Sequence, residues 1–181
     1  MADFVIISGC SGGGKSTLLA ELARRGQRVV EEPGRRIVAE ERRTGGSALP
    51  WLDPVAFARR AVAMAEQDCT RLAGAVGPVF LDRGLIDATT ALEHATGKRC
   101  LDRIARRHRF HRRVFMTPPW PEIFLGDADR RHGLGEAMAE YERLQLAYRE
   151  LGYRTETLPK SSVASRADHV VATLQRDGLV I

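Results

Sequence analysis

Cysteines, aromatic residues and long apolar runs are all scarce in this chain of 181 residues. No apolar run approaches the roughly 20 residues that a membrane-spanning helix needs. The three cysteines, Cys10, Cys69 and Cys100, are odd in number and widely spaced, which argues against a disulfide framework or a zinc site and fits a reducing compartment. An apolar run already begins at Phe4, so we expect no secretory signal and a cytoplasmic protein.

Aromatic residues make up only 6% of the chain, which leaves few surfaces on which the bases of a nucleic acid could stack. The 28 basic residues outnumber the 23 acidic ones and give a net charge of +5. A polyanionic partner is therefore expected, and a nucleotide is one such partner. Hydrophobic residues at 44% and charged residues at 28% are typical of a globular protein, and the length fits a single domain over residues 1–181.

Lysine is rare among the basic residues, because the chain contains only Lys15, Lys98 and Lys160. Lys15 lies in a stretch that fits G-x-x-x-x-G-K-[ST], the phosphate-binding P-loop. The apolar run 4–7 before it is typical of a buried parallel strand, and apolar residues at helical spacing follow it. The stretch consists of Gly9, Cys10, Ser11, Gly12, Gly13, Gly14, Lys15, Ser16 and Thr17.

The residue types of this loop match the chemistry of phosphate binding. Glycines allow the backbone to point several N–H groups at one anion, and the helix that follows adds its positive N-terminal end. We expect Lys15 to reach the β and γ phosphates of ATP, Ser16 to bind Mg²⁺ and Thr17 to line the phosphate cradle. GTP is an alternative nucleotide. Cys10 is expected to be a packed, unreactive thiol.

Strand and helix signals alternate along the whole chain, which predicts an α/β fold with a parallel sheet covered by helices on both faces. After the strand at 4–7, further strands are expected at 27–32, 79–82, 113–117 and 153–158. Ligands of such sheets bind beyond the carboxyl ends of the strands. The residues that directly follow each strand are therefore the candidates for function. Helices are expected after the P-loop, from Pro33 to about Arg43, from Asp53 to about Leu72, from about Leu85, over 101–108, over 137–151 and from Ser161.

The strand at 79–82 ends in Asp82, which follows three apolar residues as in a Walker B pattern. Such a carboxylate holds Mg²⁺ directly or through water, so Asp82 is a predicted metal ligand beside Ser16. Arg83 comes next and lies beside the predicted phosphate path, where it is a candidate catalytic residue. A surface salt bridge is the alternative role for Arg83.

Glu32 follows the second predicted strand and immediately precedes Pro33. A carboxylate near the transferred phosphate could orient the hydroxyl of an acceptor and take its proton. The alternative is that Glu32 only stabilises the positive end of the helix that begins at Pro33.

The segment 126–135 is a charged, glycine-flanked loop that carries Arg130 and Arg131. Two arginines in such a place are typical of a lid that closes over phosphates and stabilises their charge during transfer. A solvated loop is the alternative interpretation.

A basic cluster extends over residues 98–113 around one predicted helix. A solvated helix face is the simpler interpretation, and contact with nucleic acid or an acidic membrane is the other. Trp51 and Trp120 could stack on an acceptor ring, although ordinary packing is the simpler interpretation of both.

The chain resembles P-loop small-molecule kinases of the nucleoside and nucleotide kinase group. It is most similar to a family described as AAA-type ATPases, akin to nicotinamide riboside kinase domains. The resemblance depends on the P-loop, on 32–36 (Glu-Pro-Gly-Arg-Arg), on 81–84 with Asp87, and on the loop with Arg130 and Arg131. It implies the three-layer α/β/α P-loop fold with strand order 2-3-1-4-5, ATP with Mg²⁺, and an acceptor site over the helices after the second and third strands.

The resemblance also implies a role for Glu32, because deoxynucleoside kinases carry a Glu-Pro after the second strand whose glutamate acts near the acceptor hydroxyl. Where those kinases have Glu-Arg-Ser after the third strand, this chain has Asp82, Arg83 and Gly84. We therefore predict a kinase that transfers the γ-phosphoryl group of ATP to a hydroxyl of a nucleoside-like or other small metabolite. The alternatives are a regulatory module with slow nucleotide hydrolysis and an adaptor that docks through the basic cluster.

Overall fold

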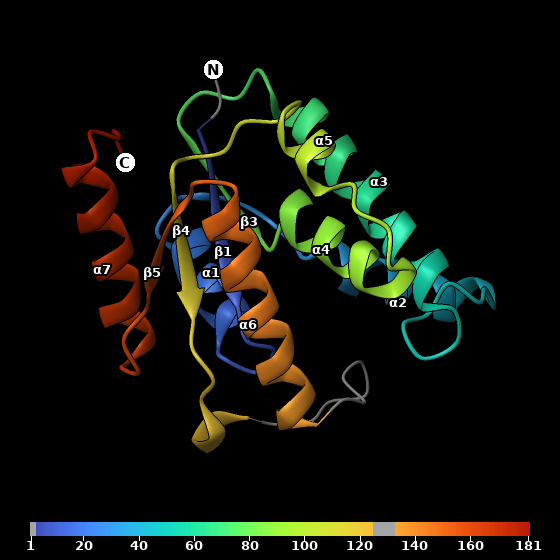
Figure 1. Ribbon diagram of the computed structural model, residues 1–181. Helices are drawn as coiled ribbons and strands as arrows, with labels where there is room; N and C mark the ends of the chain where they lie inside the picture. The colour runs from blue at the N-terminus through green and yellow to red at the C-terminus, as the bar shows by residue number, and fades with distance from the viewer. Residues whose placement is uncertain (1–2, 125–132) are drawn as a thin grey trace.

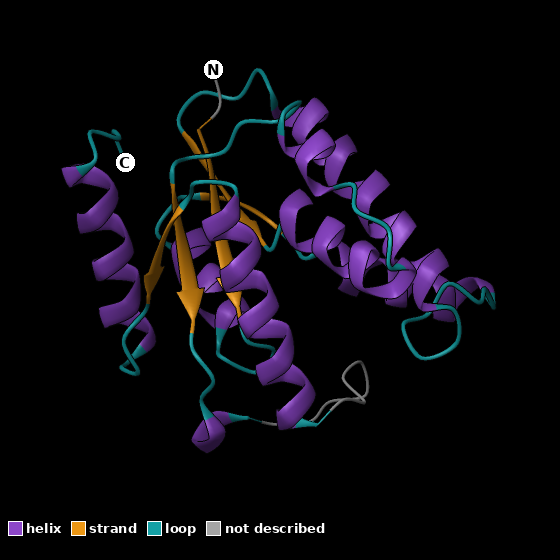
Figure 2. Ribbon diagram, viewed as in Figure 1, coloured by secondary structure: helices purple, strands orange, loops and turns teal. Residues whose placement is uncertain are grey.

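The structure is a computed structural model that describes residues 3–124 and 133–181. Figure 1 shows a central sheet with helices on either side and a group of helices beside it. Figure 2 shows the strands running side by side between the helical layers. The predicted α/β architecture is confirmed.

The sheet has five strands in the order β2-β3-β1-β4-β5, and every neighbouring pair is parallel. This is the order that the resemblance to P-loop kinases implies. Ile7 of β1 is in register with Asp82 of β3, and Gly9 is in register with Thr117 of β4. The P-loop, Asp82 and the end of β4 therefore meet at one edge of the sheet. The strands are β1 (Asp3–Gly9), β2 (Arg28–Val30), β3 (Pro78–Asp82), β4 (Arg113–Thr117) and β5 (Arg154–Thr157).

Alternating side chains of β1 divide the core into two layers, as expected for a strand with both faces covered. Val5 and Ile7 belong to a cluster with the apolar residues of α1 and α7. Phe4 and Ile6 belong to the cluster on the other face, which includes apolar residues of α6 such as Tyr148. The helices are α1 (Lys15–Arg24), α2 (Pro33–Thr44), α3 (Pro54–Leu72), α4 (Leu85–Thr96), α5 (Leu101–Ala105), α6 (Leu134–Glu150) and α7 (Val163–Arg176), with a short 3₁₀ turn η1 (Pro121–Ile123).

Helices α2 to α5 form a separate apolar cluster beside the sheet, and Figure 1 shows them grouped on the right. Ile37 of α2, Ala61 of α3 and Leu85 of α4 are buried together in it. Since α2 follows β2 and α4 follows β3, this group begins at the edge of the sheet that carries the P-loop. It can therefore form one wall of a site there.

Some element boundaries differ from the sequence-based prediction. The helix expected over 101–108 ends at Ala105, because the chain must return to the sheet. The ring of Phe110 packs edge-on against that of Phe4, with 6.3 Å between the ring centroids, and the amide of His111 donates to the Phe4 carbonyl. Helix α6 begins at Leu134, inside the loop expected to extend to residue 135. Among the described helices, none is long and apolar enough to cross a membrane.

Candidate active site

The loop between β1 and α1 has backbone angles that require glycine. Gly9 has φ +117°, and a Cβ atom there would lie 2.3 Å from the carbonyl oxygen of Thr117. Gly14 has φ +77° and caps the N-terminus of α1. Because an L-residue rarely adopts these angles, the glycines set the path of the loop. The helix then begins at Lys15, as the motif predicts.

Lys15 lies across this loop and is only 5% exposed. Its ammonium group donates to the carbonyl of Cys10 at 2.8 Å and to that of Gly9 at 3.4 Å. Burial, and secondarily the charge of Arg83, lower the pKa of Lys15, while Asp82 acts in the opposite direction. An anion in the loop would compensate the charge of Lys15, which the described carbonyls only partly satisfy.

Ser16 and Asp82 lie side by side at the end of β3, with the serine hydroxyl donating to Asp82 Oδ2 at 3.2 Å. Asp82 is 3% exposed, and its Oδ1 is buried without a hydrogen-bond partner among residues 3–124 and 133–181. Burial, followed by the nearby charge of Glu32, raises the pKa of Asp82 to about 6. A cation would favour the ionised form and supply the missing partner of Oδ1.

This pair fits Mg²⁺ better than a metal that needs a protein cage. The described part of the chain contains no group of three or more His, Cys, Asp or Glu residues that could hold a metal ion. Mg²⁺ commonly binds through one or two carboxylates, the phosphates of a nucleotide and water. Asp82 and Ser16 would hold the ion, which would neutralise charge on the phosphates when bound.

Arg83 follows Asp82 and has a positive φ of 57°, which is unusual for a residue with a side chain. Its guanidinium donates to both oxygens of Glu140 on α6, and Nη2 also approaches the Gly9 carbonyl at 3.4 Å. Its Nε is 3.6 Å from Glu32. Burial opposes the charge of Arg83, but Glu140, Glu32 and Asp87 outweigh that effect and hold its pKa well above the ordinary value.

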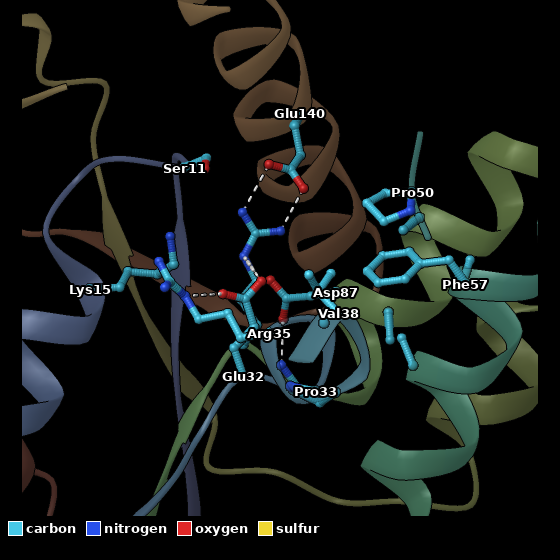
Figure 3. A pocket seen from close by; sticks show the side chains of 17 residues that line it. Ser11, Lys15, Glu32, Pro33, Arg35, Val38, Pro50, Phe57, Asp87 and Glu140 are labelled. Carbon is cyan, nitrogen blue, oxygen red and sulfur yellow. Dashed lines mark hydrogen bonds and ion pairs between the residues drawn. The ribbon is translucent and has the colours of Figure 1, made fainter. Parts of the chain in front are cut away.

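A cavity of about 230 Å³ opens between the P-loop and helices α2, α3, α4 and α6. Figure 3 shows charged side chains on one side of it and the ring of Phe57 on the other. The charged side includes Lys15, Glu32, Arg35, Arg83, Asp87 and Glu140, and the apolar side includes Val38, Pro50, Phe57, Ala61 and Ala88. The arrangement would accept a small molecule with one polar and one apolar part.

A family model described as an AAA domain matches residues 4–166. The chain belongs to this AAA-domain family. A comparison with curated proteins yields no match.

Solved structures of two kinases and of NadR share the fold of this AAA-domain protein at low sequence identity. Deoxyadenosine kinase from M. mycoides with bound dATP is 15% identical, with a TM-score of 0.57 over 96% of this chain and 99% of that chain. Shikimate kinase from Acinetobacter baumannii in complex with shikimate is 17% identical, with a TM-score of 0.61 over 99% of this chain and 97% of that chain. NadR in complex with NR is 18% identical, with a TM-score of 0.75 over 99% of this chain and 53% of that chain.

Asp87 of this AAA-domain protein ties three elements together at the base of the cavity. Its oxygens accept hydrogen bonds from Ser8 of β1, from the Gly84 amide at 3.0 Å and from the hydroxyl of Tyr148 on α6. Burial raises the pKa of Asp87, against the effects of Arg83, Ser8 and Tyr148. With three donors already on it, Asp87 holds the end of β1, the start of α4 and the C-terminal end of α6 in place.

The substitution Tyr148→Phe is expected to lower the free energy of unfolding by about 1 to 3 kcal/mol, because it leaves a buried carboxylate short of a donor. Tyr148 is fully buried. Tyr141→Phe on the same helix is the control, since the described hydrogen bond of the Tyr141 hydroxyl is one that it accepts from Gln145 in a partly buried place. This substitution should lower the free energy of unfolding by less than about 1 kcal/mol. Urea unfolding of both variants measures the difference. Equal losses would contradict the anchoring role of Asp87.

Several sequence-based candidates lie away from the cavity or outside the described residues. Arg130 and Arg131, predicted to be lid residues, lie outside the described residues. Trp51 packs beneath the guanidinium of Arg42, 5.6 Å from the ring centre, and Trp120 beneath that of Arg166 at 5.4 Å. Packing, the simpler of the two interpretations, therefore accounts for both rings.

The basic cluster 98–113 is partly neutralised. Both Arg112 and Arg113 bind Asp177, and Arg113 also binds Glu156 at 2.6 Å. Since Arg113 begins β4, this part of the cluster lies at the edge of the sheet opposite the P-loop. No residue of the cluster lines the cavity described above.

The sequence did not identify Glu140 and Arg166, two charged side chains that contact the site. Glu140 lies three residues after Ala137 and four before Leu144, on the buried face of α6, and Arg166 lies four and eight residues before Val170 and Leu174 on the buried face of α7. A charge at an apolar position of a helix is the signal that could have revealed both, because an unpaired charge is costly to bury.

Proposed function

We propose that this protein is an ATP- and Mg²⁺-dependent kinase that transfers the γ-phosphoryl group to a hydroxyl of a nucleoside-like or other small acceptor. The nucleotide phosphates would occupy the P-loop, and the acceptor would occupy the cavity beside it. The cavity carries the proposal: it places Lys15, Glu32 and Arg83 in one wall and the apolar group around Phe57 in the opposite wall. A protein that only hydrolyses nucleotide does not need such a cavity beside its phosphate-binding loop.

The division of roles follows from position. Lys15 would contact the β and γ phosphates, and Ser16 with Asp82 would hold Mg²⁺ between them. Glu32 lines the acceptor cavity at the start of α2, 3.6 Å from both Arg35 and Arg83. These arginines would orient its carboxylate toward the hydroxyl, and Glu32 would accept the proton as the new bond to phosphorus forms. Catalysis would consist mainly of positioning and charge stabilisation.

An acceptor screen tests the proposal. The release of ADP from Mg²⁺–ATP is followed with a panel of nucleosides, cofactor precursors, sugars and hydroxy acids, and again with GTP in place of ATP. A kinase releases ADP faster when its acceptor is added, and the phosphorylated acceptor accumulates in equal amount. A slow rate that no member of the panel alters would favour the alternative, a nucleotide-dependent module without an acceptor.

Phe57→Ala should raise the KM for the acceptor about tenfold, because the acceptor loses an apolar surface worth more than 1 kcal/mol. A Cβ on Gly34 would lie 3.1 Å from the Phe57 ring, so the ring closes one end of the cavity against α2. The affinity for Mg²⁺–ATP should not change. Leu52→Ala is the control, because Leu52 is similarly apolar but 64% exposed. An unchanged acceptor KM in Phe57→Ala would show that the acceptor does not bind in this cavity.

A further inference from the structure

A buried arginine from the last helix contacts the outer side of the P-loop. Arg166 of α7 is 3% exposed, and its Nη1 donates to the carbonyl of Gly13 at 3.2 Å and to that of Gly14 at 3.4 Å. The contact is so close that a Cβ on Gly14 would lie 2.9 Å from Nη1. The loop therefore packs directly onto this guanidinium.

The positive charge of Arg166 is not neutralised within the described structure. No ion pair to it is found among residues 3–124 and 133–181, and its buried Nε has no hydrogen-bond partner there. Burial alone lowers the pKa of Arg166. Arg83 is the contrasting case, because carboxylates hold its pKa high. Burying a cation without a carboxylate partner destabilises the folded state. An anion bound nearby would offset that destabilisation.

The peptide geometry shows where such an anion would lie. In a trans peptide the C=O of one residue and the N–H of the next point in opposite directions, and the described chain contains no cis peptide. The carbonyl of Gly13 points at Arg166, so the N–H group of Gly14 points away from it. The carbonyl of Gly14 also accepts from the Thr17 hydroxyl at 3.1 Å and from the Leu18 amide at 3.2 Å, with Arg166 as a further donor at 3.4 Å. The N–H group of Lys15 is therefore directed out of the N-terminus of α1, where an anion would bind.

We propose that Arg166 is a positioning residue of the nucleotide-phosphate site. By donating to the Gly13 carbonyl, and to the Gly14 carbonyl beside the Leu18 amide, it orients and polarises the peptide units whose N–H groups, those of Gly14 and Lys15, would receive the phosphates. Its charge adds to the positive potential of Lys15 and of the N-terminus of α1. The inference rests on the proposed function only in requiring that the P-loop binds phosphate, and it does not require an acceptor or turnover.

The test measures binding of Mg²⁺–ATP and of Mg²⁺–tripolyphosphate, which has the phosphates but no base or ribose, by isothermal titration. Arg166→Gln removes the charge but keeps a donor, and should weaken both ligands about tenfold. Arg166→Lys keeps the charge and should stay within about threefold of the wild type. The salt dependence of tripolyphosphate binding should become shallower only in Arg166→Gln, because one cation fewer contributes.

Arg25→Gln is the matched control. Arg25 also joins α1 to α7, through Asp168 at 2.6 Å and the Ala164 carbonyl at 3.2 Å, but it does so at the C-terminus of α1. If Arg166 merely tethered α7 to α1, Arg25→Gln would weaken the ligands as much as Arg166→Gln does. We expect Arg25→Gln to bind both ligands with wild-type affinity.

Three results would overturn the inference: unchanged affinity in Arg166→Gln, an equal loss in Arg25→Gln, and a loss for ATP but not for tripolyphosphate, which would place Arg166 against the base. Lys15→Ala separates this from the proposed function. If Lys15→Ala also binds both ligands fully, the P-loop assignment fails, whereas a loss confined to Lys15→Ala rejects only the role of Arg166.

A fluorescence measurement keeps the inference testable if Arg166→Gln does not fold. The Arg166 guanidinium lies 5.4 Å from the centre of the Trp120 ring, and the chain contains only one other tryptophan, Trp51. In Trp51→Phe, saturating Mg²⁺–tripolyphosphate should shift the Trp120 emission, because the anion changes the field of the guanidinium over the ring. An unaltered emission spectrum would count against the inference.

Discussion

Lys15→Ala is expected to abolish the stabilisation of the protein by Mg²⁺–ATP. A ligand present at 100 times its Kd stabilises the folded state by about 2.7 kcal/mol, which raises the melting temperature. This increase in melting temperature should disappear in the variant. The reason lies in the environment of Lys15: its ammonium is buried against the Cys10 and Gly9 carbonyls, with Arg83 as a nearby like charge. Alanine removes the buried cation itself, so the fold without ligand should be retained.

Lys98→Ala is the control for this measurement, because Lys98 is an exposed lysine in the basic cluster 98–113. Both variants are compared with the wild type by thermal unfolding with and without Mg²⁺–ATP, and circular dichroism confirms that each is folded. We expect Lys98→Ala to show the full shift. If Lys15→Ala shows the same shift as the wild type, nucleotide phosphate does not bind at the P-loop.

Asp82→Asn and Glu32→Gln are expected to fail in different ways. Asp82→Asn preserves shape but removes the charge beside Ser16, so both Mg²⁺-dependent nucleotide affinity and turnover should fall. Glu32→Gln preserves size but cannot accept a proton, and loss of a general base typically lowers the rate by about 10² to 10⁴. Nucleotide affinity should be retained in Glu32→Gln, because Glu32 lines the acceptor cavity and its nearest ion-pair partners are Arg35 and Arg83.

Isothermal titration with Mg²⁺–ATP, followed by turnover with the acceptor found in the screen, distinguishes the two variants. A titration without Mg²⁺ is the internal control, because the deficit of Asp82→Asn should shrink when the metal is absent. Equal weakening of nucleotide binding by both substitutions would refute the division of roles. Full turnover in Glu32→Gln would mean that another carboxylate acts as the general base or that the protein is not a kinase.

The local parts of the site were predictable from the sequence because each is encoded by neighbouring residues. The P-loop requires glycine at left-handed angles between a strand and a helix, and those residue types stand in one stretch of nine. Asp82 was predictable because three apolar residues precede it in the strand. The sheet order came from the resemblance to P-loop kinases, since the alternation of elements by itself leaves the order of parallel strands open.

Boundaries were predicted less well where a distant contact ends an element. Helix α5 stops at Ala105, short of the predicted residue 108, because Phe110 must reach Phe4 in β1. The role of Arg83 also depends on a distant residue. It was expected beside the phosphate path, and its guanidinium is bound by Glu140, 57 residues later in the chain.

The sequence by itself determined that this chain carries a phosphate-binding loop, a carboxylate at the end of a neighbouring strand and an α/β fold around them. Only the tertiary structure decided which charges meet: Arg83 with Glu140, Asp87 with Ser8 and Tyr148, and Arg166 with the carbonyls of Gly13 and Gly14. Backbone conformation is set by adjacent residues, and so it can be read from a motif. The partner of a buried charge is set by the packing of helices far apart in sequence, and no spacing rule encodes it.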